Sequence, residues 1–200
     1  MLSTTELFVE HIISGILSLI WVGAIAFSVT GIDPSLMPFI KDFWGLFALV
    51  TTAIAYPIGI FVDTIADKIL ERWNGRIKVK NEVQNESIIL LLHKLKDDNL
   101  TAYFTYNRFK TRVSRSSALN FLLIGITVPM FILLQGNALG VEHPLRIALT
   151  IFITFILLSV IAILLWREIA YSVHRRTKQV VDSNRGAGFK NVPVMVPPMK

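Results

Sequence analysis

The chain has 200 residues, of which 53% are hydrophobic and only 17% are charged, and its formal net charge is +6. A soluble domain carries about 25% charged residues, so this composition excludes an ordinary soluble domain and favours a membrane protein. The sequence contains no cysteine, which excludes a disulfide framework, a cysteine-based zinc site and a thiol nucleophile.

Four long apolar stretches contain no charged residue, and each predicts a transmembrane helix, because a helix needs about 20 apolar residues to cross the hydrocarbon layer. They are residues 12–32, 43–62, 118–135 and 147–166. We therefore predict an all-α polytopic membrane protein with four transmembrane helices, two of them extended into the cytoplasm. The expected parts are a first hairpin (1–63), a basic cytoplasmic helical loop (64–117), a second hairpin (118–166) and a basic tail (167–200), disordered at its end.

The first stretch has an alternative interpretation as a cleaved signal peptide, because residues 24–26 have the small-x-small form of a cleavage site. However, residues 1–11 lack Lys and Arg and contain Glu6 and Glu10, whereas a signal peptide begins with positive charge. We therefore expect the first stretch to remain as a membrane helix.

The distribution of Lys and Arg predicts the orientation. Residues 64–117 hold eleven of them and residues 167–200 hold seven, whereas the two other loops hold only Lys41 and Arg146. Loops rich in Lys and Arg stay in the cytoplasm. We therefore predict a multi-pass inner-membrane protein with both termini in the cytoplasm. Trp44 and Trp166 stand at stretch ends, where interfacial anchors are common.

A stripe of small and polar residues follows helical spacing along the second stretch: Thr52, Ala55, Gly59 and Asp63. One interpretation is a packing seam, since small residues let membrane helices approach closely. The other is the lining of a polar path, with Asp63 forming a cation-attracting ring in an oligomer. We expect this helix to continue beyond Asp63 and to end at Asn74 and Gly75.

The loop before the third stretch carries a basic helical face, because Arg108, Arg112 and Arg115 recur at i, i+4 and i+7. Anionic lipid headgroups are one expected partner, and a phosphate ligand such as a nucleotide is a second, because the guanidinium fork suits phosphate. A third is pairing with acidic residues of the same loop. Those residues are Glu71, Glu82 and Glu86.

Two further segments carry weaker signals. Residues 86–96 predict an amphipathic helix, either on the membrane surface or in a small bundle. The last helix is expected to reach about Val181, and the Pro-containing end is either disordered or an extended peptide for a cytosolic partner protein.

Catalytic motifs are missing, so we predict that the chain is not an enzyme. The four histidines are far apart in the sequence, and we predict no metal and no cofactor. Glu10 and His11 are adjacent, which we interpret as a capping pair at the membrane edge. Nucleic acid is not expected as a direct ligand, because the basic face is small and tethered to the membrane.

With its four spans, its little external mass and the basic loop over residues 72–115, the chain resembles small four-span membrane subunits of bacterial anti-phage defence systems. The resemblance implies a homo-oligomer that permeabilises the inner membrane or holds a cytosolic partner there. Our first hypothesis is an oligomeric, channel-like membrane effector controlled through its basic loop. The alternatives are a non-conducting anchor or scaffold that recruits a protein through loop and tail, and a lipid-acting or lipid-binding enzyme.

Overall fold

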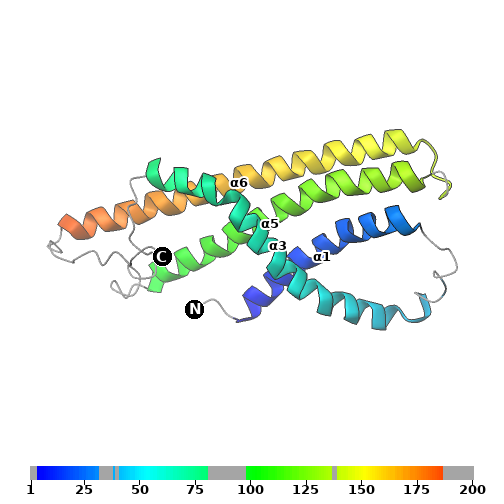
Figure 1. The fold of residues 1–200 in the computed structure, drawn as a ribbon. Helices are drawn as coiled ribbons and strands as arrows, with labels where there is room; N and C mark the ends of the chain where they lie inside the picture. Colours follow the sequence, from blue (N-terminus) through cyan, green and yellow to red (C-terminus); the bar gives the residue numbers. More distant parts are fainter. Residues whose placement is uncertain (1–3, 32–37, 39–40, 81–97, 137–138, 187–200) are drawn as a thin grey trace, which may run out of the picture.

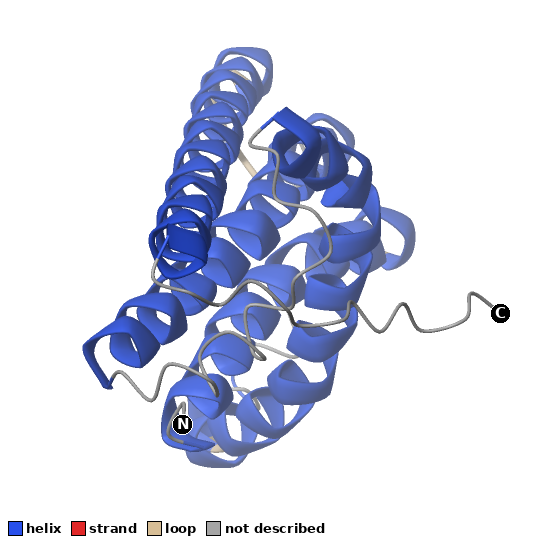
Figure 2. Ribbon diagram, turned by 90° about the vertical axis from the view of Figure 1, so that its left-hand side faces the viewer, coloured by secondary structure: helices blue, strands red, loops and turns tan. Residues whose placement is uncertain are grey.

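The computed structural model describes residues 4–31, 38, 41–80, 98–136 and 139–186. Within these residues all regular structure is helical (Figure 2). The four long helices are α1 (Thr4–Thr30), α3 (Trp44–Lys80), α5 (Asp98–Gln135) and α6 (Pro144–Gly186). Each contains a segment long and apolar enough to cross a membrane, so the predicted class, an all-helical multi-pass membrane protein, is confirmed.

The helices alternate in direction (Figure 1). The second halves of α1 and α5 and the first halves of α3 and α6 lie at one end of the bundle, to the right in that view. The opposite ends of the four helices gather on the left. We call the left side the basic end, since Arg108, Arg112 and Arg115 belong to the first half of α5 and Arg175 and Arg176 to the second half of α6.

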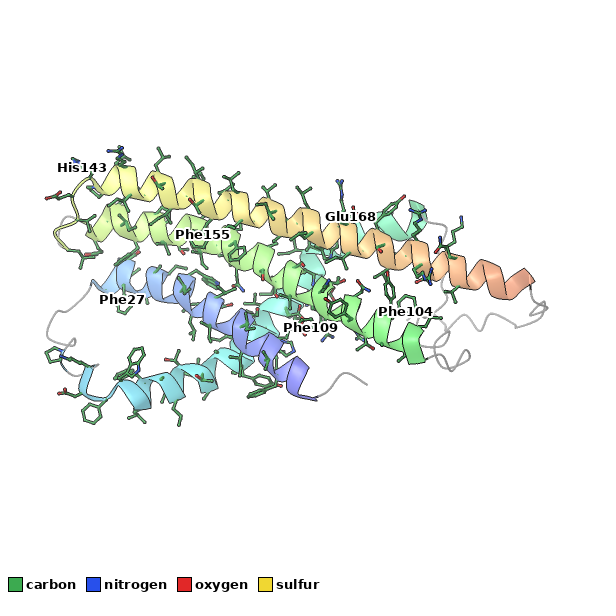
Figure 3. All side chains as sticks on the ribbon, turned by 180° about the vertical axis from the view of Figure 1, so that it is seen from behind. Phe27, Phe104, Phe109, His143, Phe155 and Glu168 are labelled. Carbon is green, nitrogen blue, oxygen red and sulfur yellow. The ribbon has the colours of Figure 1, made fainter. Side chains whose placement is uncertain are left out.

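Two antiparallel hairpins make up the bundle. α6 lies along α5, and their contact is filled by side chains such as Phe155 of α6, whose ring stands 6.0 Å from that of Phe121 (Figure 3). α1 lies between α5 and the first part of α3 (Figure 1). α3 then turns across α5 towards α6, and Pro57 inside it supplies a cause, because proline removes one hydrogen bond of the helix.

Three helices are longer than a span requires. At 1.5 Å per residue, the 43 residues of α6 extend about 65 Å, roughly twice the thickness of the hydrocarbon layer. α3 with 37 residues and α5 with 38 are also too long for the hydrocarbon alone. The extra turns of α3, α5 and α6, which we call the rods, lie at the basic end and carry most of the charged residues of these helices.

Two sequence predictions about helix ends are wrong. α3 does not end at Asn74 and Gly75 but continues to Lys80. Gly75 is exposed with no heavy atom near its Cβ position, and a glycine in such a place costs only about 1 kcal/mol, which does not stop a helix between good helix formers. α6 also passes Val181 and reaches Gly186.

Trp166 is likewise not an interfacial anchor. Its side chain is only 2% exposed, because it lies on the inner face of α6, whereas Trp44 at the start of α3 is 69% exposed. The amphipathic segment at 86–96 and the Pro-containing end at 187–200 lie outside the described residues.

Candidate functional site at the basic end

The α1/α3 contact brings together three small residues, which we call the glycine seam: Gly15, Ala55 and Gly59. A Cβ atom added to Gly15 would overlap the carbonyl oxygen of Ala55, and one added to Gly59 would overlap that of His11. The two backbones therefore touch directly, which only glycine permits. Ala55 is fully buried there.

The other polar members of the predicted stripe have different surroundings. Thr52 is exposed and donates its hydroxyl to the carbonyl oxygen of Ala48, 2.8 Å away on its own helix. Asp63 lies one turn beyond Gly59 and faces α5, where it meets an arginine. The predicted stripe therefore has three kinds of surroundings: Ala55 and Gly59 pack against α1, Thr52 is exposed on the surface, and Asp63 forms an ion pair.

Arg115 of α5 joins two carboxylates of α3. Its Nη2 donates to Oδ1 of Asp63 at 2.9 Å, and its Nη1 donates to Asp67. The side chains of Arg115 and Asp63 are only 11% and 13% exposed, whereas Asp67 is 64% exposed. Asp63 and Asp67 compensate the charge of Arg115. Among the described residues, the other two members of the basic face, Arg108 and Arg112, form no such ion pair, and their charge is available for an external anion.

The partners of Arg115 are not those considered from the sequence. Asp63 and Asp67 belong to the opposite helix, 52 and 48 residues away. The side chains of Glu71, Glu82 and Glu86 lie outside the described residues. Charge alone could have suggested the α3 acids, since Asp63 and Asp67 follow the second stretch on one helical face.

Replacing Asp63 with Asn is expected to destabilise the protein by about 2 kcal/mol, because it removes a shielded, charge-assisted hydrogen bond. The matched change Asp67→Asn should cost less than about 1 kcal/mol, because Asp67 is largely exposed and solvent screens its charge. Unfolding in mixed micelles, followed by tryptophan fluorescence, measures both. Equal losses of stability in the two variants would show that the shielded Arg115–Asp63 pair contributes no more than the exposed Arg115–Asp67 pair.

Glu10 lies beside this ion pair and is only 3% exposed. Neither of its carboxylate oxygens accepts a hydrogen bond from any described residue. The charges acting on it are those of Arg112, Asp63, Arg115 and Arg108, so it faces α3 and α5. The interpretation as a capping pair is wrong, because α1 begins at Thr4 and Glu10 stands in the interior of the helix.

His11 faces α3 rather than α5. Its ring stands edge-on to that of Tyr56, 5.9 Å between centroids, and Tyr56 also meets Phe8 at 5.0 Å. These ring contacts join α1 to α3 beside the glycine seam. Adjacent residues of α1 thus serve different contacts: His11 packs against α3, and Glu10 turns towards the arginines.

A buried hydrogen-bond network links α1 to α5 one turn further into the bundle. Asn120 of α5 is fully buried, and its Oδ1 accepts from Ser18 Oγ at 2.8 Å and from Trp21 Nε1 at 3.1 Å. Its Nδ2 donates to the carbonyl oxygen of Ser14 at 3.0 Å. The sequence pattern did not point to Asn120, although it is the only carboxamide in the third apolar stretch before Gln135.

Polar contacts between the same two helices continue to the far end. Gln135 Nε2 donates to the carbonyl oxygen of Ser28 at 3.4 Å. The α5/α6 contact has bonds of its own, from Ser159 Oγ to the carbonyl oxygen of Ala118 at 2.9 Å and between the hydroxyls of Tyr103 and Ser172 at 3.2 Å.

The basic end therefore combines a fixed ion pair, two arginines of the basic face and a buried carboxylate, all at the junction of α1, α3 and α5. Such a junction can transmit a change at the basic face to the membrane helices, since α3 and α5 run through it without a break. No protein-family model matches the sequence, and no curated protein or solved structure is significantly similar to it.

Proposed function

We propose that the protein is an oligomeric inner-membrane effector, channel-like in action, whose basic cytoplasmic face controls the packing of its membrane helices. The observation that carries this proposal is the clasp of Asp63 and Asp67 around Arg115. It joins the basic face on α5 to α3, one helical turn from the glycine seam. Binding of an anionic headgroup or phosphate at Arg108 and Arg112 would act next to this clasp.

The physical basis is competition for Arg115. An anion held by Arg112 lies one turn from Arg115, because the two residues are three positions apart on one helix. A guanidinium can exchange a carboxylate for a phosphate at little cost, since both accept the same bidentate geometry. When Arg115 leaves α3, Asp63 loses its shielded partner, and the contact of α3 with α5 weakens.

A non-conducting anchor or scaffold is the second candidate, and a specific observation favours it. Ala55 and Gly59 are occupied by packing against α1, and Asp63 is occupied by Arg115, so these residues line no open path in the single chain. A scaffold would keep this arrangement permanently and recruit its partner through the rods at the basic end.

Ion flux from vesicles separates the two candidates. Purified protein is reconstituted with either a neutral lipid or a mixture rich in anionic lipid, and potassium efflux is measured. We expect Arg115→Gln to raise basal efflux several-fold above the native protein, because it opens the clasp. The control Lys68→Gln removes a positive charge from an exposed position of α3 and should leave efflux unchanged.

The absence of efflux from native protein and from Arg115→Gln in both lipids would reject the effector and leave the scaffold. A role in anti-phage defence is a separate part of the proposal. It predicts that expression of the chain with its genomic neighbours lowers phage plating, and that Arg115→Gln causes toxicity without phage.

A further inference from the structure

The contact of α1 with α3, inside the first hairpin, differs in kind from the contact of α1 with α5, between the two hairpins. Inside the first hairpin the glycine seam brings backbones into direct contact. Between the hairpins, α1 and α5 meet through buried polar groups. Water can replace a hydrogen bond at small net cost, but it cannot replace close packing of two backbones. Separation of the four helices would therefore begin between α1 and α5.

The polar groups of this interface follow one face of each helix, with the buried apolar residues Ala24 and Ile124 between them midway along, and we call this row the polar seam. On α1, residues 10, 14, 18, 21 and 28 fall on one helical face. On α5, residues 116, 120 and 127 share another. The members are Glu10, Ser14, Ser18, Trp21 and Ser28 of α1, and Ser116, Asn120, Thr127 and Gln135 of α5. All but Trp21 and Gln135 are at least nine-tenths buried. Their Oγ atoms, the Asn120 Oδ1 and the bonded carbonyls supply oxygen ligands along the membrane.

Glu10 at the basic end of the polar seam points to a ligand. A buried carboxylate without hydrogen bonds is costly, and a purely structural interface would pair it or replace it with an apolar residue. Glu10 is the only acidic or basic residue of the seam. Of the arginines beside it, Arg115 is compensated by Asp63 and Asp67, whereas Arg112 and Arg108 are compensated by the anion that the proposed function places on them. A carboxylate at the mouth of an oxygen-lined path is the arrangement that attracts cations.

We propose that the polar seam is the path of small monovalent cations, opened when the α1/α3 hairpin moves away from the α5/α6 hairpin. Water then takes the place of the bonds to Asn120, and Glu10 gives the path its preference for cations. This inference rests on the proposed effector function, for which it names the conducting surface. It differs from a pore around Asp63, because the path lies between α1 and α5 and leaves the glycine seam closed.

The absence of native cysteines allows a direct test. Single variants Ser18→Cys and Ser28→Cys place a thiol in the polar seam with little change of volume. The matched controls Ile20→Cys and Val29→Cys place one on the exposed, lipid-facing side of the same helix. Vesicles of anionic lipid containing each full-length variant are treated with a charged methanethiosulfonate reagent, while potassium efflux is followed. Circular dichroism and a monodisperse elution profile confirm folding beforehand.

Both seam variants are expected to react and to lose efflux several-fold, whereas the two controls keep their efflux. In the same vesicles Glu10→Gln should lower the permeability ratio of potassium over chloride several-fold. Two results would overturn the polar seam as the path and leave the effector function standing. In the first, efflux persists while the seam thiols stay unreactive; in the second, the thiols react but efflux is not blocked. Absence of efflux from every variant and lipid overturns both proposals.

Discussion

Replacement of Gly15 with alanine is expected to destabilise the protein by about 3 kcal/mol, the upper range for inserting a methyl group into a closed contact. The added Cβ would overlap the carbonyl oxygen of Ala55, which is backbone and cannot rotate away. α1 and α3 must then separate along the whole crossing, and the rings of Tyr56 and Phe8 lose their contact with each other. Unfolding in mixed micelles with increasing sodium dodecyl sulfate measures the loss.

The same helix supplies the control. A Cβ at Gly23 would meet only the ring edge of Phe27 at 3.9 Å, an ordinary contact. Gly23→Ala should therefore be neutral or stabilising by up to about 1 kcal/mol, since alanine is the better helix former. On α3, Gly59→Ala should behave as Gly15→Ala does, and Gly45→Ala as Gly23→Ala. Equal stability of Gly15→Ala and Gly23→Ala would mean that α1 and α3 do not cross at this seam.

Asn120→Leu is expected to destabilise the protein by about 2 kcal/mol. The change keeps the branched shape and the number of side-chain heavy atoms but removes the hydrogen bonds to Ser14, Ser18 and Trp21. Hydrogen bonds between membrane helices contribute about 0.6 kcal/mol each on average and up to about 1.7 kcal/mol. Trp21 Nε1 loses its acceptor, whereas Ser18 retains a bond to the carbonyl oxygen of Ser14 within α1.

Trp21→Phe isolates one of these bonds. It removes only the indole donor and should cost about 0.6 kcal/mol beyond the small loss of buried area. The chain has four tryptophans, so the difference between the fluorescence spectra with and without Trp21→Phe isolates the indole of Trp21, and this difference should change when Asn120 is replaced. If Asn120→Leu leaves stability unchanged, α1 and α5 are held by apolar packing, and the polar network is incidental.

The length and the lack of charge of the apolar stretches are sufficient to predict the fold class, because a span must be long, apolar and uninterrupted by charge. The four spans follow from that requirement, as does the helical continuation past Asp63 and ahead of Ala118. Gly75 predicts an end of α3 that the structure does not have, because its weak local preference is outweighed by good helix formers on both sides, such as Arg72, Arg76 and Lys78.

The site was harder to predict for a physical reason. The pairing of Arg115 with Asp63 depends on which faces of α3 and α5 meet, and helical spacing within one stretch carries no information on that. Asn120 was overlooked because a neutral amide leaves hydropathy almost unchanged, although its hydrogen bonds decide which helices pair. Glu10 was assigned to a helix end because the start of α1 was placed too late in the sequence.

The separation of Ser18 and Asn120 by 102 residues has a consequence for how the chain enters the membrane. At a synthesis rate of about 5 to 20 residues per second, Asn120 emerges roughly 5 to 20 s after Ser18. The first hairpin can close at once, because the glycine seam needs no later residue. During that interval Ser14, Ser18 and Trp21 lack their partner Asn120, so the nascent first hairpin presents a polar side that the insertion machinery must shelter until the second hairpin arrives.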